Sequence, residues 1–320
     1  MSTITGTIEK IDKEKRIWNP SISLVLCTYN GAKYIREQMD SLINQTYPIK
    51  ELLVFDDASK DDTVKILEEY RQSNPIIKIF VNPVNLGFNN NFRQALLKAD
   101  ADVIAISDQD DIWHLQKLEK MINQWVEDTL VIYCDSVRFA DTPNRDSEIN
   151  PHYQRFLGTD SRQLSIFNTI SGHAMLLKRE IIPLIIDFKD DVIYDWWIGV
   201  VAACNGGVSY VPDILVYQRI HGNNVTIGNG YDYQNKKEKA MFKSMVNRHL
   251  KNFIFTPNMS EHHCRFYKKL AKLWYDSLTK KINIKLALFL FGNRNLVFPY
   301  GRKKNSVISH LKHSLKKAKN

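Results

Sequence analysis

Short apolar runs alternate with amphipathic segments over the first 135 residues, and this order restricts the chain to few folds. Each run has four to six residues, the length expected of a buried strand. In the segments between the runs, apolar residues recur at helical spacing. A regular alternation of strand and helix predicts an α/β fold, with a mostly parallel sheet flanked by helices. The expected strands are 22–27, 52–55, 76–81, 103–106 and 130–133, with helices starting near Tyr34, Asp61, Phe88 and Leu115.

Polar residues follow three of these expected strands at the point where each strand ends. In parallel α/β sheets, ligands bind beyond the carboxyl ends of the strands. We therefore expect the three clusters to meet at one edge of the sheet and to form a binding site there. The clusters are Thr28, Tyr29 and Asn30, then Asp56 and Asp57, and then the stretch 107–113.

The stretch 107–113, Ser-Asp-Gln-Asp-Asp-Ile-Trp, carries three carboxylates within four residues. Carboxylates this close repel one another unless a cation compensates their charge. Mg²⁺ and Mn²⁺ favour carboxylate oxygens, so Asp108 and Asp110 are candidate metal ligands. The alternative is a polar turn that caps the following helix, because Asp is common at N-caps. The cluster taken alone favours the cap, and the two neighbouring clusters shift the balance to the metal.

The chain lacks the usual glycine-rich phosphate loops, both GxGxxG after the first strand and GxxxxGK[ST]. A bound diphosphate would then need another counter-charge, which a divalent metal on Asp108 and Asp110 would supply. Tyr29 could stack on a base, and Asp57 could accept hydrogen bonds from a pyrimidine ring or from ribose hydroxyls. A strand-end Asp is, alternatively, often only a helix cap.

After residue 135 the alternation lapses into a polar loop, expected at 136–160. The apolar pattern returns at 174–177, directly after Ser171, Gly172 and His173. A helix is expected to open at 194–197, Tyr-Asp-Trp-Trp, and to run through Cys204. Two short strands are expected at 208–211 and 214–217, and a turn-like polar cluster, Arg-Ile-His-Gly-Asn-Asn, at 219–224.

Charge divides the chain into two parts of opposite sign. Residues 233–320 carry 21 Lys/Arg against three Asp/Glu, a balance of +18, and the remaining residues have a balance of −9. Parts that differ this much are expected to do different jobs. We divide the chain into a lead-in (1–20), an α/β domain (21–230) and a basic, aromatic-rich helical region (231–320).

Three interpretations of the basic region stay open. Its lysines and apolar faces suit the surface of an anionic membrane. The region could instead be a helical subdomain that packs its aromatic stripe on the α/β domain, and the two interpretations are compatible. Binding of single-stranded nucleic acid comes last, because no nucleic-acid module is recognisable. No nucleic-acid partner is therefore expected.

The four cysteines are dispersed and form no CxxC pair. They predict neither a disulfide framework nor a zinc site and fit a reducing cytoplasm. The first residues lack the apolar core of a signal peptide, and no apolar run approaches the ~20 residues that span a bilayer. We expect a cytoplasmic protein, either soluble or peripheral on the inner face of the cell membrane.

Several of these stretches, in this order, resemble family 2 glycosyltransferases with a GT-A (Rossmann-like) fold. The resemblance covers about residues 20–225, and the acidic stretch matches the family's DXD motif. The most similar subgroup includes rhamnosyltransferases of polysaccharide biosynthesis. Ala58 departs from the family pattern, which usually has Gly at this position. The matching stretches are 23–30, 54–61, 85–87 with Asn91 and Phe92, 107–113, 171–173, 194–197 and 219–224.

The resemblance implies a reaction and the residues that carry it. A sugar would move, with inversion, from a nucleotide diphosphate (dTDP-rhamnose or a UDP-sugar) to a hydroxyl of a glycan or lipid-linked acceptor in cell-surface polysaccharide biosynthesis. Asp195 matches the family's catalytic carboxylate and is expected to take the proton of the acceptor hydroxyl. Its alternative role is N-cap of the 195–204 helix. The cofactor, Mg²⁺ or Mn²⁺, is expected on Asp108, Asp110 and His221.

The other expected site residues divide into a donor side and an acceptor side. One of the two tryptophans is expected to be an acceptor platform and the other a core residue. Asp111 is expected to support the turn, either beside the metal ligands or as a helix cap. Arg219 is expected to reach the diphosphate. The donor side comprises Thr28, Tyr29, Asn30, Asp57, Asn91, Asp108, Gln109 and Arg219, and the acceptor side Gly172, His173, Trp196 and Trp197.

Two further function classes use parts of the same pattern. A metal-dependent sugar nucleotidyltransferase would also place carboxylates at strand ends, but it releases diphosphate from a nucleoside triphosphate. The Asp195-Trp196-Trp197 cluster and the downstream His221 favour the glycosyltransferase. A non-catalytic membrane-surface scaffold is the third class, and intact polar clusters at all three strand ends, two of them with carboxylates, argue against it.

Overall fold

The computed structural model describes residues 18–149, 154–222, 235–298 and 307–319, so most of the expected lead-in lies outside the described residues. The expected alternation of strands and helices is present, with boundaries within a few residues of those predicted. The elements of the first half are β1 (Ile22–Thr28), α1 (Ile35–Ile43), β2 (Glu51–Asp56), α2 (Thr63–Ser73), β3 (Ile77–Val81), α3 (Phe88–Lys98), β4 (Val103–Ser107), β5 (Ile112–Trp113), α4 (Lys117–Asn123) and β6 (Val131–Phe139).

The second half contains two more strands of the sheet and then helices alone. Its elements are η1 (Ser161–Leu164), η2 (Gly172–Ala174), β7 (Met175–Lys178), η3 (Arg179–Ile181), α5 (Ile182–Ile185), α6 (Tyr194–Asn205), β8 (Val208–Arg219), α7 (Lys236–Phe253), α8 (Glu261–Thr279), α9 (Ile284–Gly292), α10 (Arg294–Val297) and α11 (Val307–Ala318). None of these described helices is long and apolar enough to cross a membrane.

The strands form one sheet in the order β3-β2-β1-β4-β7-β6-β8-β5. Strands β3, β2, β1 and β4 are parallel, β7 runs antiparallel to both of its neighbours, and β6 and β8 are parallel. The expected α/β class with a mostly parallel sheet is confirmed. Because β2, β1 and β4 are neighbours, the three polar clusters that follow them lie at the same edge.

Strand β8 differs from the two short strands that were expected. It is continuous over twelve residues, and β6 runs on to Phe139, inside the segment expected to be loop. The register with β6 jumps from Val211 to Ile214, so Pro212 and Asp213 form a bulge. Proline has no backbone N–H for the ladder and is tolerated at bulges. The proline thus marks an irregularity within one strand.

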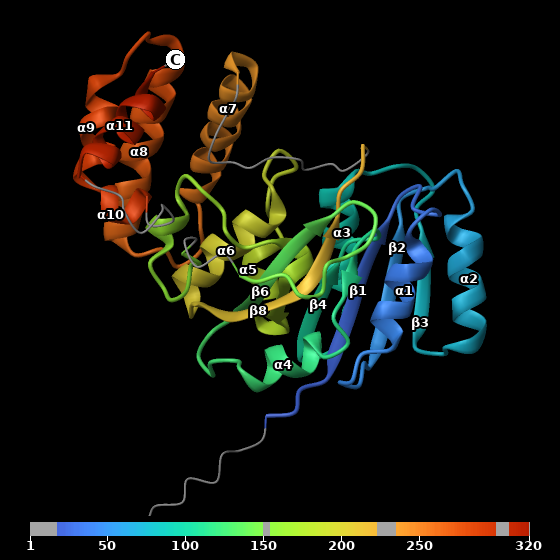
Figure 1. Ribbon diagram of the computed structural model, residues 1–320. Coiled ribbons are helices and arrows are strands. Elements are labelled where there is room, and N and C mark those ends of the chain that lie inside the picture. Colours follow the sequence, from blue (N-terminus) through green and yellow to red (C-terminus); the bar gives the residue numbers. More distant parts are fainter. Residues whose placement is uncertain (1–17, 150–153, 223–234, 299–306, 320) are drawn as a thin grey trace, which may run out of the picture.

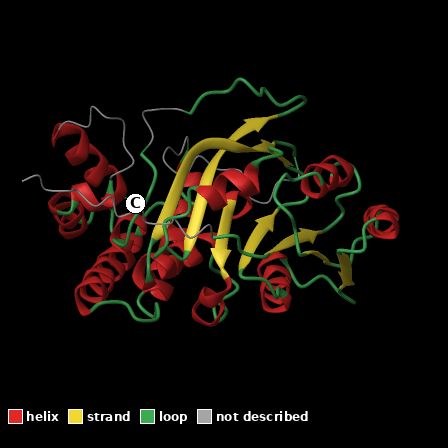
Figure 2. Cartoon of the chain, turned by 90° about the horizontal axis from the view of Figure 1, so that it is seen from below, coloured by secondary structure: helices red, strands yellow, loops and turns green. Residues whose placement is uncertain are grey.

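Helices cover both faces of the sheet (Figures 1 and 2). On one face, α1, α2 and α4 contribute Met39, Leu67 and Leu118 to a core with residues of β1, β2 and β4. The other face packs against α3, α5 and α6. Continuous with that second core are the apolar residues of the C-terminal helices, including Phe253 and Trp274.

The basic region packs its aromatic stripe inward, as the subdomain interpretation required. Phe266, Leu270 and Trp274 of α8 are buried, and the Trp274 indole donates a hydrogen bond to the Lys243 carbonyl oxygen. Helices α8, α9, α10 and α11 gather beside the sheet, at the left of Figure 1. This packing accounts for the aromatic side chains and leaves most of the lysines at the surface.

Candidate active site

The backbone at the ends of β1 and β2 is shaped by short side chains. The Asp56 carboxylate accepts hydrogen bonds from the Thr28 hydroxyl (2.8 Å) and from the Ser59 N–H (2.8 Å). Asn30 and Ala58 both adopt positive φ angles, 48° and 64°. Asn tolerates this conformation, whereas Ala is strained in it. This strain explains why the family that the sequence resembles usually has Gly at the Ala58 position.

Gln109 joins the ends of β1 and β4. Its side chain accepts a hydrogen bond from the Tyr29 N–H (2.8 Å) and donates one to the Tyr29 carbonyl oxygen (3.1 Å). Gly31 lies so close that a Cβ atom there would be 2.3 Å from the Gln109 Oε1. The Tyr29 side chain itself is 46% exposed. Gln109 therefore fixes the backbone, and Tyr29 offers an open ring face to a planar ligand.

Asp57 holds the loop that precedes α3. Its carboxylate accepts hydrogen bonds from the Leu86 N–H (2.8 Å), the Gly87 N–H (2.9 Å) and the Asn82 amide (2.9 Å). Asn91 is 2% exposed, and its amide bonds to the Phe55 carbonyl oxygen and to Asn82. Asn91 is thus buried within the protein, and its expected contact with the nucleotide stays a prediction.

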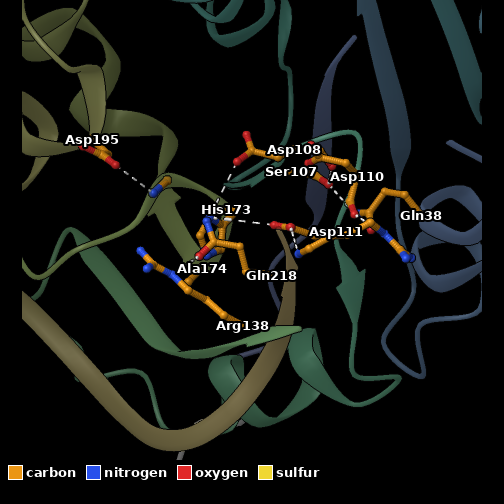
Figure 3. A network of polar contacts seen from close by, with 12 residues as sticks. Gln38, Ser107, Asp108, Asp110, Asp111, Arg138, His173, Ala174, Asp195 and Gln218 are labelled. Atoms are coloured by element: carbon orange, nitrogen blue, oxygen red, sulfur yellow. Dashed lines mark hydrogen bonds and ion pairs between the residues drawn. The ribbon is translucent and has the colours of Figure 1, made fainter. Parts of the chain in front are cut away.

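Three side chains at the end of β4 come together as a candidate metal group: Asp108, Asp111 and His173 (Figure 3). One ligand atom from each lies within 4.8 Å of the others. His173 Nδ1 is 3.6 Å from Asp108 Oδ2 and 3.8 Å from Asp111 Oδ2. Sheet order explains the arrangement, because β7 runs antiparallel to β4 and so starts, just after His173, beside the end of β4.

The donor set fits a divalent cation. Two carboxylates and one imidazole are ligands that suit Mn²⁺, and carboxylates suit Mg²⁺. The buried oxygen Asp111 Oδ2 accepts no hydrogen bond from the described residues. A buried carboxylate oxygen without a donor is costly, and a bound cation would compensate it.

Asp110 and His221 also meet, but outside this group. His221 Nε2 lies 2.7 Å from Asp110 Oδ2, and its ring stacks on Tyr34 with centroids 4.9 Å apart. The expected ligands were Asp108, Asp110 and His221. In the structure Asp108 is grouped instead with Asp111 and His173. Asp111 was expected to support the turn, and His173 was expected on the acceptor side. The predicted helix-capping role of Asp111 is also wrong, because α4 has Gln116 as its N-cap.

The charges of this cluster shift its pKa values. Burial raises the pKa of Asp111 to about 7, and the carboxylates of Asp108 and Asp110 add to the rise while His173 opposes it. Burial also raises the pKa of Asp110, with Asp108 adding and His221 opposing. Burial by itself lowers the pKa of His173, but Asp111 and Asp108 outweigh it and the net shift is upward. Such a cluster attracts positive charge.

Arg219 packs against the turn that carries Asp110 and Asp111. Its guanidinium is buried between the rings of Tyr34 and Phe139, 4.7 and 4.6 Å from their centroids. It donates to the Asp110 carbonyl oxygen and to Glu37. Its backbone N–H donates to Asp111 Oδ1 (3.1 Å). Arg219 therefore positions the carboxylates, and its expected contact with the diphosphate stays a prediction. Asn223 and Asn224, the last residues of its motif, lie outside the described residues.

Asp195 lies across the η2 turn from the metal group (Figure 3). Its carboxylate accepts hydrogen bonds from the Gly172 N–H (3.1 Å) and from the Asn168 amide (2.9 Å). Burial raises the pKa of Asp195 to about 6, against the lowering influence of the Gly172 N–H and of His173. The N-cap of α6 is Ile193, so Asp195 sits in the first turn and is free of the predicted capping role.

The two tryptophans after Asp195 are core residues. Trp196 is 2% exposed and Trp197 6% exposed, and their indole N–H groups donate to the carbonyl oxygens of Leu164 and Ile185. The structure therefore corrects the expectation that one of them forms an acceptor platform. Glycine is required at position 172, because a Cβ atom there would lie 2.0 Å from the Tyr194 hydroxyl oxygen.

Sequence reasoning missed two residues of the site. Asn168 orients Asp195, and it stands in an irregular segment without any pattern that could have marked it. Lys117 is fully buried. Its Nζ donates a hydrogen bond to the His173 carbonyl oxygen (2.7 Å) and lies 3.2 Å from the ring centroid of Trp113. Burial lowers the pKa of Lys117 to about 7. A lysine at the start of a helix gave no sequence signal of burial.

Comparison with known proteins adds a family. The sequence profile of Glycosyl transferase family 2 matches residues 23–182. A curated relative, an uncharacterised protein of Mycobacterium tuberculosis, is 29% identical over 213 residues, which are 64% of this chain and 60% of the relative. The chain thus spans less than two thirds of the length of that relative.

Two solved structures share the fold. S. aureus TarS, in complex with UDP-GlcNAc, is 18% identical with a TM-score of 0.57, over 93% of this chain and 89% of that chain. The mannosyltransferase PcManGT from Pyrobaculum calidifontis, in complex with GDP-Man and Mn²⁺, is 18% identical with a TM-score of 0.54, over 94% of this chain and 87% of that chain. At these identities the likeness establishes the fold alone, and the fold is GT-A-like.

Proposed function

This chain belongs to glycosyltransferase family 2, and on that premise we propose that it is an inverting glycosyltransferase. It moves a sugar from a nucleotide diphosphate, dTDP-rhamnose or a UDP-sugar, to a hydroxyl of a glycan or lipid-linked acceptor. The product enters cell-surface polysaccharide. The observation that carries the proposal is the position of Asp195, a half-buried carboxylate with a raised pKa beside a separate candidate metal group.

The donor occupies the edge formed by the ends of β1, β2 and β4. The exposed Tyr29 ring supplies a stacking surface for the base, and Asp57 fixes the neighbouring loop at the same edge. A divalent cation on Asp108, Asp111 and His173 would neutralise the charge that the leaving diphosphate gathers. The fold neighbours that hold UDP-GlcNAc, and GDP-Man with Mn²⁺, support this class of donor and cofactor.

Asp195 takes the proton from the acceptor hydroxyl as that oxygen attacks the anomeric carbon. The Gly172 N–H and the Asn168 amide each hold one carboxylate oxygen and so fix its orientation. A pKa of about 6 keeps the carboxylate ionised near neutral pH while making it a stronger base than an exposed Asp. Separating the base from the metal group lets one side handle the acceptor and the other the leaving group.

The basic helices bring this site to an anionic membrane surface. Residues 233–320 have a balance of +18, and few acids are available there to neutralise it. Each lysine near an anionic leaflet contributes roughly 1 kcal/mol of attraction. At such a surface the enzyme would act on an acceptor that is linked to lipid.

The function is tested with a panel of nucleotide sugars. Thermal shift with Mn²⁺ present is expected to select one nucleotide diphosphate sugar, and that donor should release a nucleoside diphosphate when an acceptor is added. Release of diphosphate from a nucleoside triphosphate would instead identify a nucleotidyltransferase. A protein that binds no nucleotide sugar at all would contradict the proposal.

A further inference from the structure

A groove of about 750 Å³ lies between α8 and α9, away from the strand-end site. None of the residues that line it belongs to the donor or acceptor sides described above. Its volume is within the range of ligand sites in proteins, about 300–1,000 Å³. The groove therefore requires an explanation of its own.

The floor of the groove is apolar. Phe266 of α8 is buried, and its ring packs against that of Phe289 of α9 with centroids 5.4 Å apart. Leu273 continues this floor along α8. Beside the floor, Leu288 of α9 is 65% exposed, and Ile284, one turn earlier on α9, is 66% exposed. Contiguous apolar side chains left open to water are typical of a surface that is covered by a partner.

The rim of the groove is cationic. Arg265, Lys269 and Lys285 are exposed, and no Asp or Glu is among the lining residues. Lys269 Nζ lies 5.4 Å from the centroid of the Phe289 ring, so its aliphatic chain runs along the apolar floor. Arg265 has a salt bridge with Glu261 on the exposed surface of α8. Lys269 and Lys285 thus line the groove together with its apolar floor, and no acidic residue is among the lining residues.

An apolar floor under a cationic rim is complementary to an amphipathic anion. We propose that the α8–α9 groove binds an anionic phospholipid of a membrane surface. Its phosphate lies at Lys269 and Lys285, and the upper part of one acyl chain lies on Phe266, Leu273 and Phe289. Ile284 and Leu288 insert shallowly beside it, as apolar faces of surface-bound helices do. The inference rests on the membrane part of the proposed function and gives that contact a specific site.

Vesicle flotation of the full chain tests the groove. Vesicles of phosphatidylcholine alone are compared with vesicles that also contain phosphatidylglycerol. The chain is expected to float only with the anionic vesicles. The double variant Lys269→Gln/Lys285→Gln should lose about tenfold or more in affinity. The matched control, Lys236→Gln/Lys237→Gln, removes the same charge from the exposed start of α7 and should lose less than about threefold.

A second pair of variants keeps the lysines in place. Gly292 lines the groove, and a Cβ atom added there would meet no atom within 4 Å. Gly292→Glu puts an anion into the groove and should reduce binding to anionic vesicles as strongly as the lysine pair. Gly292→Ala, its control, should bind as the unchanged protein does. Equal thermal midpoints of all variants would establish that they fold.

The outcomes separate this inference from the proposed function. Equal losses of vesicle affinity in the groove variant and in its α7 control would overturn the lipid site in the groove. Such a result would indicate a diffuse attraction of the basic region to membranes. Binding of soluble polyglutamate that is tighter than binding to anionic vesicles, and that is lost in Lys269→Gln/Lys285→Gln, would identify an acidic peptide as the occupant and overturn the lipid. Absence of binding to anionic vesicles would overturn both the groove and the membrane part of the function. Transfer to a soluble acceptor should stay unchanged in every variant, so glycosyl transfer is judged separately.

Discussion

The strand-end site and the α8–α9 groove hold their charged groups in opposite surroundings. In the site, Asp57, Asp111, His173 and Arg219 are each at most 5% exposed. In the groove, Arg265, Lys269 and Lys285 are exposed, while apolar residues form the floor. These charged groups of the site are therefore held in fixed positions before a ligand binds, as electrostatic catalysis requires. The groove presents hydrated charges on long side chains, which suits a surface whose partner is itself mobile.

Helices α6 and α7 connect the two regions. His249 of α7 accepts a hydrogen bond from the N–H of Ile193, the N-cap of α6, and its ring stacks on Trp196 with centroids 4.3 Å apart. Asp195 lies two residues after Ile193. The basic helices thus contact the end of the helix that carries the expected base, although most of their own charges face solvent. Five predictions test how far the two regions act separately.

The largest effect is expected at Asp195. Asp195→Asn keeps the shape of the side chain but removes its ability to take a proton, so transfer should fall by roughly 10²–10⁴-fold. Nucleotide affinity, measured by calorimetry, should stay nearly unchanged because Asp195 lies on the acceptor side. Substantial turnover in this variant would remove Asp195 as the base.

The next effect concerns the metal group. EDTA is expected to stop transfer, and Mn²⁺ or Mg²⁺ to restore it. His173→Gln should weaken Mn²⁺ binding by more than about 10–100-fold, the cost typical of losing a supporting residue outside the ligand set. His221→Gln should weaken Mn²⁺ binding less, since His221 contacts Asp110 outside the group. The reverse order in a Mn²⁺ titration would return the ligand set to Asp108, Asp110 and His221.

The contact between the two regions should be sensitive to acid. Burial lowers the pKa of His249 from 6.5 to about 4. Above pH 6.5 this histidine is neutral in both the folded and unfolded states and has no effect. Between pH 6.5 and about 4 only the unfolded state is protonated, so the free energy of unfolding should fall by on the order of 1 kcal/mol per pH unit. Urea unfolding of His249→Gln at several pH values should show a shallower fall of the free energy of unfolding with decreasing pH.

A smaller effect is expected at Asn168. The transfer rate should fall as the pH drops below about 6, because protonated Asp195 cannot accept a proton. Asn168→Ala removes a donor that stabilises the carboxylate, so the pKa should rise and the acidic limb should move to higher pH by about one unit. The pH profile of Asn252→Ala, on α7, is the control. An unmoved limb in Asn168→Ala would mean that Asn168 has no influence on the base.

The smallest effect is expected at Ala58. Its φ of 64° is strained for a residue with a Cβ atom, so Ala58→Gly should raise the free energy of unfolding by about 1 kcal/mol or less. Ala240→Gly, in the helical backbone of α7, should lower it by about 0.5–1 kcal/mol. Denaturant unfolding measures both changes. The same sign for both substitutions would contradict the strain at Ala58.

The pattern of apolar and polar residues along the chain predicted the elements that depend on residues close in sequence. The strand and helix periodicity of residues 22–135 gave the elements, and the ends of β1, β2 and β4 gave the position of the site. Continuous pairing of β8 through Pro212 was missed, because a bulge depends on the partner strand. Burial of Lys117 and Trp196 was missed as well, since an isolated side chain carries no mark of what will pack on it.

The sequence by itself thus determined the fold class, the family and the edge of the sheet where the polar clusters lie. Only the tertiary structure decided which of those residues meet. Strand β7 enters the sheet antiparallel between β4 and β6 and so delivers His173 to Asp108 and Asp111, more than sixty residues earlier in the chain. Pairing of β5 with β8 likewise brings Arg219 and His221 to Asp110. Strand order is set by packing across the whole sheet, and a metal group assembled by it has no local signature.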